Sequence, residues 1–251
     1  MRQFLIALQF LTVIPIPFSI RSEERDLGRS MALFPLVGLT LGALLAGADF
    51  ILTPWLPRVI NDLLLVAILS TVTGCLHLDG LADVCDGLAS RGGRERFLAV
   101  MKDSRIGAVG VVGLVLGLLL KYQALLNIPM QYKRETLLFF PAAARCSQVL
   151  ITVGAKKARG DGLGSLFIDG AGIRQLVWAC VITLGCAWIL VGYRGLIVIA
   201  ALWLFSWGIR RYFIRRLGGI SGDIIGFASE LNEVFCLLLL LGLYINCDSF
   251  G

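Results

Sequence analysis

The sequence predicts an all-α fold: a polytopic helical membrane protein with about seven transmembrane helices and a short extra helix at its N-terminus. Hydrophobic residues make up 57% of the chain and charged residues only 16%, and the mean hydropathy is +0.84. These values lie outside the range of soluble domains. Seven apolar stretches approach the ~20 residues that a helix needs to span a bilayer, and they occupy 30–52, 60–78, 107–128, 136–154, 174–193, 195–209 and 224–246.

The first apolar segment, 4–18, is too short to span a bilayer comfortably. It follows one basic residue and lacks a cleavage site of small residues, so it does not resemble a signal peptide. Because proline disrupts helices, Pro15 and Pro17 should stop any helix that begins here. We therefore expect an interfacial or re-entrant helix at the N-terminus.

Short loops join the expected spans and leave no room for a separate soluble domain. No low-complexity linker and no repeat of fixed period interrupts them, so we expect a single integral membrane domain over 1–251. In the first span, Gly38, Gly42 and Ala46 recur every four residues. Such faces of small residues let helices approach closely, which predicts helix packing there and no ligand contact.

Basic residues are distributed unevenly between the expected loops. Sixteen lysines and arginines fall in 15–29, 79–106, 156–174 and 210–223, whereas the loops of the opposite side hold four. Because loops rich in Lys and Arg stay in the cytoplasm, we expect the first set on the cytoplasmic face. The formal net charge of +6 mostly reflects this asymmetry. No patch of basic and aromatic residues accompanies it, so we expect a lipid bilayer as a partner and no nucleic acid.

Three carboxylates directly follow the second expected span. Asp79, Asp83 and Asp86 are spaced i, i+4, i+7, which places them on one face of a helix. Like charges so arranged repel, and a divalent cation among them removes that cost. Hard oxygen ligands favour magnesium, manganese or calcium over zinc. The alternative is a solvated helix end, whose acids pair with Arg91, Arg94 and Arg96.

A second polar cluster precedes the third expected span, where Gly107 and Gly110 stand at the start of a helix. Glycines and exposed amides at a helix N-terminus suit phosphate oxygens, and Arg105 could clamp such oxygens with two hydrogen bonds. The alternative is an anchor on the positive side of the membrane, with the glycines used for helix packing. The other polar members of this cluster are Lys102, Asp103 and Ser104.

The last expected span begins with a polar cluster at 218–233. Asp223 and Glu230 are seven residues apart on one helix face, and Glu230 lies inside the span. An acid within a membrane span is a functional candidate by default. The alternative is a structural ion pair between Glu230 and Arg145 of the fourth span. Lys121, in the middle of the third span, has no assigned partner and could face a polar cavity.

Several of these motifs carry a resemblance to a known family. The segments HLDGLADVCDG (77–87), MKDSRIGAVG (101–110), DGLG (161–164) and GGISGDIIGFASE (218–230) occur in this order, and FPLVG (34–38) fits the first span. Together they resemble the cobalamin synthase family, the adenosylcobinamide-GDP ribazoletransferases of bacteria and archaea. The likeness covers roughly residues 1–240. Asp161 is a conservative departure, since the family usually has glutamate there.

The resemblance implies that the ribose 3′-hydroxyl of α-ribazole, or of its 5′-phosphate, attacks the pyrophosphate of adenosylcobinamide-GDP. GMP leaves, and the nucleotide loop of cobalamin is completed at the cytoplasmic membrane of a bacterium or archaeon. Cleaving a pyrophosphate requires cations that offset the charge of the leaving phosphate, and carboxylate-bound magnesium supplies them. An alcohol nucleophile also needs a base, and a carboxylate free of metal can serve.

These implications assign roles to the polar residues. We expect magnesium as the cofactor, with ligands among Asp79, Asp83, Asp86, Asp103 and Asp223. Catalytic residues are expected among Asp83, Asp86 and Glu230. Substrate contacts are expected among His77, Lys102, Arg105, Gly107, Gly110 and Gly222, although His77 could instead sit at the membrane interface. The sequence leaves open whether the chain forms a homodimer.

Two other functions compete with this one. The segment 83–91 nearly matches the front half of the signature of CDP-alcohol phosphotransferases, with Ser90 in place of an alanine. The back half of that signature fails, because it requires a glycine and two aspartates where the chain has Val100, Ser104 and Ala108. An ion-coupled transporter could use Glu230, Arg145 and Lys121 along a pathway. Against it, the acids and glycines crowd one side of the membrane, and the opposite loops are nearly bare of polar groups.

Overall fold

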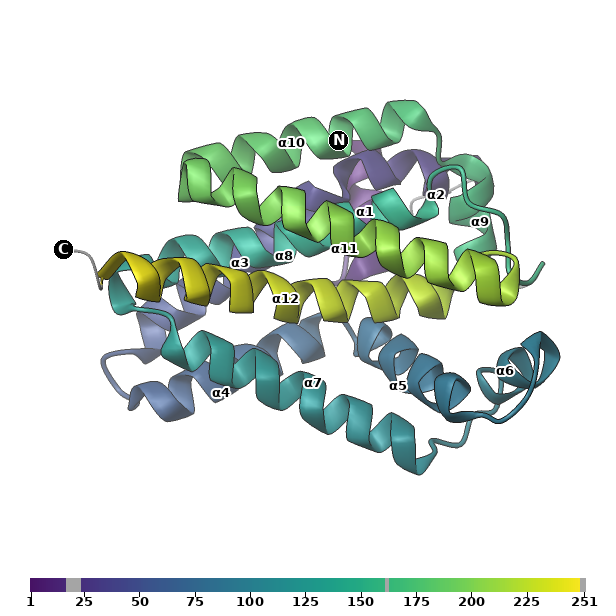
Figure 1. Ribbon diagram of the computed structural model, residues 1–251. Coiled ribbons are helices and arrows are strands. Elements are labelled where there is room, and N and C mark those ends of the chain that lie inside the picture. The colour runs from purple at the N-terminus through teal and green to yellow at the C-terminus, as the bar shows by residue number, and fades with distance from the viewer. Residues whose placement is uncertain (17–23, 161–162, 249–251) are drawn as a thin grey trace.

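The computed structural model describes residues 1–16, 24–160 and 163–248 (Figure 1). Its elements are α1 (Arg2–Leu11), α2 (Glu24–Ser30), η1 (Met31–Leu33), α3 (Phe34–Leu52), α4 (Arg58–Val72), α5 (Leu76–Ala89), α6 (Arg94–Val100), α7 (Ala108–Asn127), α8 (Met130–Thr152), α9 (Leu163–Gly170), α10 (Ile173–Val191), α11 (Tyr193–Leu217) and α12 (Gly222–Asp248). The described residues contain no strand beyond one isolated bridge, which confirms the predicted all-α class.

The protein is a multi-pass membrane protein. Among the described residues, five helical segments are long and apolar enough to cross a membrane: Arg25–Leu52, Ala108–Asn127, Ile173–Val191, Tyr193–Leu217 and Gly222–Ile245. The bent pair α4 and α5 would make a sixth. The predicted count of seven is therefore not confirmed.

The difference from seven lies in α8, which covers the span predicted at 136–154. This helix is 23 residues long and is not among the apolar spans. It packs against α3, α10, α11 and α12. Its Lys133 and Arg145 are almost completely buried, so protein and not lipid surrounds these charges. A helix in this central place does not need the uniformly apolar surface of one that faces lipid.

The span predicted as continuous at 60–78 is wrong, because a break divides it. Helix α4 ends at Val72, α5 begins at Leu76, and the two axes differ by 89°. Gly74 and Cys75 have positive φ angles of 60° and 55°, a left-handed backbone that a right-handed helix cannot contain. The break turns α5 so that it packs against both α7 and α12.

Close helix contacts occur where the small residues predicted them. A Cβ on Gly38 would lie 2.5 Å from the Cα of Ala142, and one on Gly42 would lie 2.6 Å from the carbonyl oxygen of Leu137. Both contacts join α3 to α8. The predicted packing role of this glycine face is confirmed.

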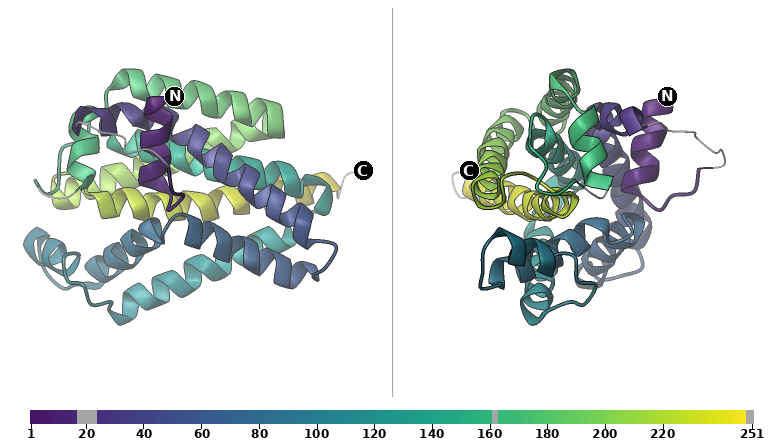
Figure 2. Two further views of the ribbon diagram at one scale, coloured as in Figure 1. Left: turned by 180° about the vertical axis from the view of Figure 1, so that it is seen from behind. Right: turned by 90° about the vertical axis from the view of Figure 1, so that its right-hand side faces the viewer.

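The N-terminal helix is short and does not run with the bundle. Figure 2 shows α1 crossing the direction of the long helices. It ends at Leu11, before Pro15, so proline is not what stops it. The amide of Val13 then donates to the carbonyl of Val72, at the end of α4. Pro17 lies outside the described residues, and the interfacial placement of this helix remains a prediction.

Three of the basic loops meet at one end of the bundle, at the right of Figure 1, which we call the basic end. Arg94 donates hydrogen bonds to the carbonyl oxygens of Leu217 (2.7 Å) and Ala158 (2.8 Å). Lys157 forms the isolated bridge with Ile220. The loops predicted to share one side of the membrane are therefore in direct contact.

Candidate functional site

The three acids of α5 lie in different surroundings although they share one helix face. Asp86 accepts hydrogen bonds from the backbone amides of Gly107 and Gly110, both at 2.7 Å. These amides belong to the start of α7. The first N–H groups of a helix have no acceptor within the helix itself. A carboxylate there also offsets the positive end of the helix dipole. Asp86 thus joins α5 to α7.

This contact changes the interpretation of two predicted groups. The amides of Gly107 and Gly110 were expected to meet substrate phosphate, but they bind the carboxylate of Asp86. A Cβ on either glycine would collide with that carboxylate. The anion at this helix start is therefore supplied by the chain itself. A metal-binding or catalytic role for Asp86 remains a prediction.

Asp79 and Asp83, by contrast, keep their carboxylates available. Within the described part of the chain, neither side chain has a hydrogen bond or an ion pair. Both line a hollow of about 490 Å³ between α5, α7 and the loop that carries Lys102 and Arg105. Asp83 is half-buried and experiences the charges of Asp79, Asp223 and Asp86. The hollow is therefore a place of concentrated negative charge.

A second, narrower space adjoins the first. It is a cavity of about 190 Å³, with one polar and one apolar wall. Its polar side chains are His77, Asp79, Gln148, Arg159 and Asp223, and its apolar wall includes Phe10, Phe34 and Phe167. Asp79 borders both the cavity and the hollow. The exposed carboxylate of Asp79 thus stands where the two spaces meet.

The polar wall contains buried atoms without a partner. The side-chain nitrogen of Gln148 lies 2.8 Å from Nε2 of His77. If the amide donates this hydrogen bond, Nδ1 of His77 carries the ring hydrogen. Among the described residues, neither Nδ1 of His77 nor Oε1 of Gln148 has a hydrogen-bond partner. Since buried polar groups are normally satisfied, both atoms indicate a ligand or water in the cavity. His77 is buried at this wall of the cavity, and its contact with substrate remains a prediction.

Asp223 stands on the same wall and pairs with Arg159 at 3.0 Å. The α5 backbone approaches closely at this point, because a Cβ on Gly80 would lie 2.6 Å from the carbonyl oxygen of Asp223. Gly222 also lines the cavity, and a Cβ on Gly164 would lie 2.5 Å from its Cα. Glycines therefore let α5, α9 and α12 meet around the acids. Asp161 lies outside the described residues.

The apolar wall is built from three phenylalanines. The ring of Phe167 lies 4.4 Å from that of Phe10 and 5.7 Å from that of Phe34, measured between centroids. They come from α9, α1 and α3, so the short N-terminal helix contributes directly to the cavity. Sequence analysis did not place these residues, nor Gln148 or Arg159, in the site. Only Arg159 carried a signal, since it directly precedes the glycine-rich loop.

The outer rim of the hollow holds Asp103 and Arg105. Arg105 donates two hydrogen bonds to Asp103, from Nε at 3.0 Å and from Nη2 at 2.8 Å. The Arg105 guanidinium lowers the pKa of Asp103 to about 2. Both groups are exposed to solvent, so the pair is weak and an incoming phosphate could displace Asp103. Lys102 lines the same hollow.

Glu230 lies deeper, in a buried network of four charged residues. Lys121 pairs with Glu230 at 2.7 Å and with Glu233 at 2.5 Å. Arg145 pairs with Glu233. The predicted pair of Arg145 with Glu230 is therefore wrong, and Lys121, which had no assigned partner, holds both acids. The network joins α7, α8 and α12 in the interior. A catalytic role for Glu230 remains a prediction.

The arrangement of these acids limits how a magnesium ion could bind. In the described ranges, no three His, Cys, Asp or Glu side chains are grouped closely enough to hold a metal ion by themselves. Magnesium, however, commonly takes one or two carboxylates and completes its shell with water and substrate phosphates. Asp79 and Asp83, which are one helical turn apart and line the same hollow, match that requirement.

The fold and the site together define a class: an α-helical membrane protein whose unpaired carboxylates and amphipathic cavity open at one end of the helix bundle. The chain belongs to the cobalamin-5-phosphate synthase family, whose sequence pattern matches residues 3–241. This confirms the resemblance found in the motifs. No solved structure matches the chain.

Individual relatives are similar over almost their whole length. An adenosylcobinamide-GDP ribazoletransferase of Geotalea daltonii is 63% identical over 243 residues, which cover 97% of this chain and 98% of the relative. Proteins of the same name from Acetivibrio thermocellus and Pseudomonas aeruginosa are 36% and 39% identical, over 95% and 96% of this chain and 97% and 98% of the relatives.

Proposed function

We propose that this protein is an adenosylcobinamide-GDP ribazoletransferase. It transfers the adenosylcobinamide phosphate group to a ribose hydroxyl of α-ribazole, or of its 5′-phosphate, and releases GMP. Membership of the family and the names of the relatives support this activity. The product completes the nucleotide loop of cobalamin.

The proposal rests on the position of Asp79, which lines both the cavity and the hollow. The cavity has an aromatic wall and a polar wall, as a nucleoside with an aromatic base requires. The hollow has carboxylates on one side and Lys102 and Arg105 on its rim, as a magnesium-bound pyrophosphate requires. A hydroxyl in the cavity and a phosphorus in the hollow would therefore meet beside Asp79.

In the cavity, the phenylalanine rings of α1, α3 and α9 bind the base of the ribazole. The Nδ1 hydrogen of His77 and Oε1 of Gln148 bind its ribose hydroxyls, which gives these two buried atoms the partners they lack. Holding the hydroxyl in line with the phosphorus lowers the activation free energy, by up to ~7–11 kcal/mol in favourable cases.

In the hollow, Asp79 and Asp83 would hold magnesium, and Lys102 and Arg105 would bind phosphate oxygens. The bound ion would offset the negative charge that develops on the pyrophosphate. Arg105 changes partner from Asp103 to the phosphate, since the exposed ion pair costs little to break. Both cationic side chains then act on the phosphate of the GMP that leaves.

Asp223 accepts the proton of the attacking hydroxyl. The ribose oxygen forms a bond to the phosphorus of the adenosylcobinamide phosphate, and the bridging oxygen leaves with GMP. Arg159 holds Asp223 in place on the cavity wall. Since phosphoryl transfer passes through a loose transition state, the proton moves late and a weakly basic carboxylate suffices.

The basic end faces the cytoplasm of a bacterial or archaeal cell, because most of the lysines and arginines lie there. Cysteines replacing Arg91, Lys156 and Arg174 in a cysteine-free background should resist membrane-impermeant thiol reagents in intact cells. A cysteine replacing Trp55, which is 81% exposed at the other end, should react. The reverse pattern of labelling would contradict this orientation.

The activity is tested with purified protein in liposomes. Given magnesium, adenosylcobinamide-GDP and α-ribazole, it should release GMP and form a cobalamin, and chelation of the divalent cation should stop the reaction. Release of CMP from CDP-diacylglycerol and an alcohol would instead identify a CDP-alcohol phosphotransferase. Accumulation of a labelled ion without nucleotide release would identify a transporter.

A further inference from the structure

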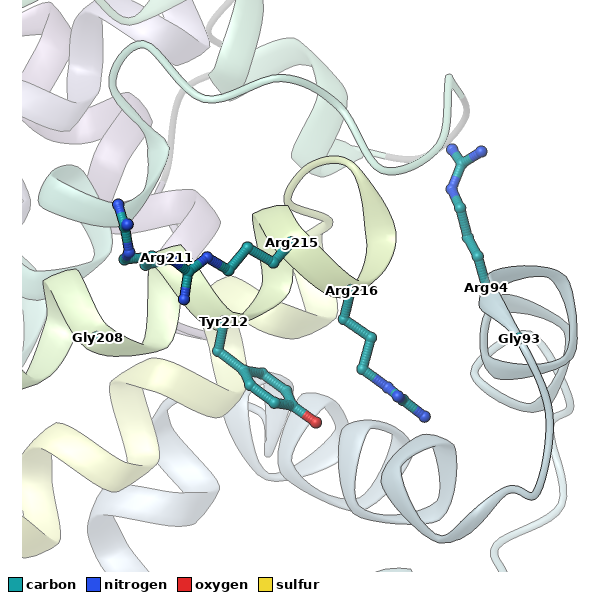
Figure 3. Close-up of a pocket in the computed structure, with 7 residues that line it drawn as sticks. All are labelled: Gly93, Arg94, Gly208, Arg211, Tyr212, Arg215 and Arg216. Atoms are coloured by element: carbon teal, nitrogen blue, oxygen red, sulfur yellow. The ribbon is translucent and has the colours of Figure 1, made fainter.

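A separate hollow lies on the outside of the basic end, between α6 and α11 (Figure 3). Its volume is about 440 Å³, and its lining consists of Gly93, Arg94, Gly208, Arg211, Tyr212, Arg215 and Arg216. It shares no lining residue with the cavity or the hollow of the candidate site. We call it the arginine pocket.

The charge of the arginine pocket is entirely positive. Four of its seven lining residues are arginines, and none is an acid. In the described part of the chain, Arg211, Arg215 and Arg216 have no carboxylate partner. Arg94 is held by two backbone carbonyls, which do not neutralise it. Such a group of guanidiniums binds phosphate oxygens well, because each presents several donors in one plane.

The arginine pocket also lies at the boundary between apolar and charged surface. On the outward side of α11, Leu204 is 68% exposed and Trp207 is 57% exposed. Arg211 follows one turn later, with its guanidinium 5.4 Å from the centre of the Trp207 ring. Tyr212 stands beside it in the pocket (Figure 3). Tryptophan and tyrosine followed by arginine mark the level of lipid headgroups on a membrane helix.

Gly208 leaves this boundary open. A Cβ added to it would meet no atom within 4 Å, so no side chain closes the pocket on the side of the apolar surface. A ligand with a phosphate among the arginines could therefore extend a chain along the helix past Trp207. A soluble phosphate compound would use only the charged half of this arrangement.

We propose that the arginine pocket binds the headgroup of an anionic phospholipid, with the phosphate on Arg211, Arg215 and Arg216 and the acyl chains beside Leu204 and Trp207. Basic pockets between membrane helices at the positively charged side are known to select such lipids. The site is independent of the proposed transferase activity.

Purified protein is titrated in detergent with phosphatidylglycerol, phosphatidylcholine or glycerol 3-phosphate, and the bound molecules are counted by native mass spectrometry. The variant Arg211→Gln/Arg215→Gln should weaken phosphatidylglycerol binding at least tenfold. The matched variant Lys156→Gln/Arg174→Gln removes the same charge from the same end and should change it less than twofold. Gly208→Phe, which keeps every charge and fills the pocket, should weaken it like the arginine variant.

Three results would overturn the proposal. Equal weakening by both glutamine variants would mean that the lipid senses only the overall surface charge. Unchanged binding in Gly208→Phe would mean that the lipid lies elsewhere. Displacement of phosphatidylglycerol by glycerol 3-phosphate at comparable concentration would identify a soluble phosphate compound as the ligand. Phosphatidylcholine, which carries no net charge, should bind all variants weakly and alike.

Discussion

Two pairs of aspartates differ in the residues around them. One pair, Asp79 and Asp83, lies on α5, and the other consists of Asp49 of α3 and Asp62 of α4. At the end of the bundle opposite the basic end, Lys133 pairs with Asp49 at 2.7 Å and with Asp62 at 2.5 Å. Asn61 donates a further hydrogen bond to Asp49 at 2.7 Å. On α5, Asp79 and Asp83 repel each other, and within the described residues neither forms an ion pair.

The difference separates structural acids from acids available for chemistry. Lys133 is itself almost fully buried, and Arg58 also pairs with Asp62 at 3.3 Å, so two cations balance the two acids at this end of the bundle. The carboxylates of Asp79 and Asp83 must be neutralised from outside, by a metal ion or a cationic ligand. The opposite end therefore does contain polar groups, contrary to the expectation of a nearly bare surface, but its two acids are held in ion pairs.

The strongest test of this comparison removes the shared lysine. Lys133→Met leaves two acids short of a partner in the interior, and we expect it to lower the free energy of unfolding by ~3 kcal/mol. Denaturation in mixed detergent micelles measures this. Adding Asp49→Asn should recover most of the loss, because Asp62 keeps its ion pair with Arg58 and the remaining charges balance. If the single variant is as stable as the parent, the network is not structural.

The converse test neutralises an unpaired acid. Asp83→Asn should reduce turnover at least ~100-fold, equivalent to ~2.7 kcal/mol of transition-state stabilisation, by removing a proposed magnesium ligand. Its unfolding should change by no more than ~0.5 kcal/mol, since no partner is lost. GMP release and the same denaturation assay measure the two quantities. Near-normal turnover would remove Asp83 from the site.

Substitution of Asp86 should lower the free energy of unfolding less than Lys133→Met does and more than Asp83→Asn does. Because it holds the two glycine amides at the start of α7, Asp86→Ala should lower the free energy of unfolding by ~1–2 kcal/mol, as loss of a helix cap does. Asp86→Asn keeps one acceptor oxygen and should lose less. A large loss of turnover in Asp86→Asn with normal stability would instead assign Asp86 to the chemistry.

A milder change tests the aromatic wall. Phe167→Leu conserves most of the buried volume but removes the ring contacts, which contribute ~0.5–1.5 kcal/mol. We expect KM for α-ribazole to rise ~3–10-fold with kcat nearly unchanged. Steady-state GMP release at varied ribazole concentration measures this. The matched change Phe97→Leu, at a buried ring of α6 that packs against Phe213 and does not line the cavity, should leave KM unaltered.

The smallest effect concerns the exposed pair on the rim. Since Arg105 lowers the pKa of Asp103 to about 2, Asp103 stays ionised throughout pH 5–8. Any stability that this pair contributes is present above the unfolded pKa of the acid and is lost only as the pH falls toward 2. Asp103→Asn should therefore not alter the shape of the pH–rate profile between pH 5 and 8. A displaced limb of that profile would show that Asp103 titrates in the reaction.

The sequence predicted correctly the features that depend on residues close together along one helix. The common face of Asp79, Asp83 and Asp86 follows from their spacing, and the packing of Gly38 and Gly42 follows from their recurrence. The family follows from motifs that are contiguous in the chain. Each of these features is local, so no tertiary contact was needed to find it.

What the sequence did not reveal depends on contacts between distant segments. Asp86 meets amides that lie 21 and 24 residues away, and Lys121 meets Glu230 across 109 residues. The break at Gly74 arises from backbone angles inside an otherwise apolar run, where no proline marks it. Nothing local distinguishes an acid that will find such a partner from one that will not.

The contact of Asp86 with α7 has a further consequence for the rim of the hollow. By tying the end of α5 to the start of α7, it closes residues 87–106, including α6, into a ring. The entropy of closing that loop is lost once, when the protein folds. When a substrate arrives, Lys102 and Arg105 are already carried on a closed backbone, so binding restricts only their side chains, at ~0.5–1.5 kcal/mol each.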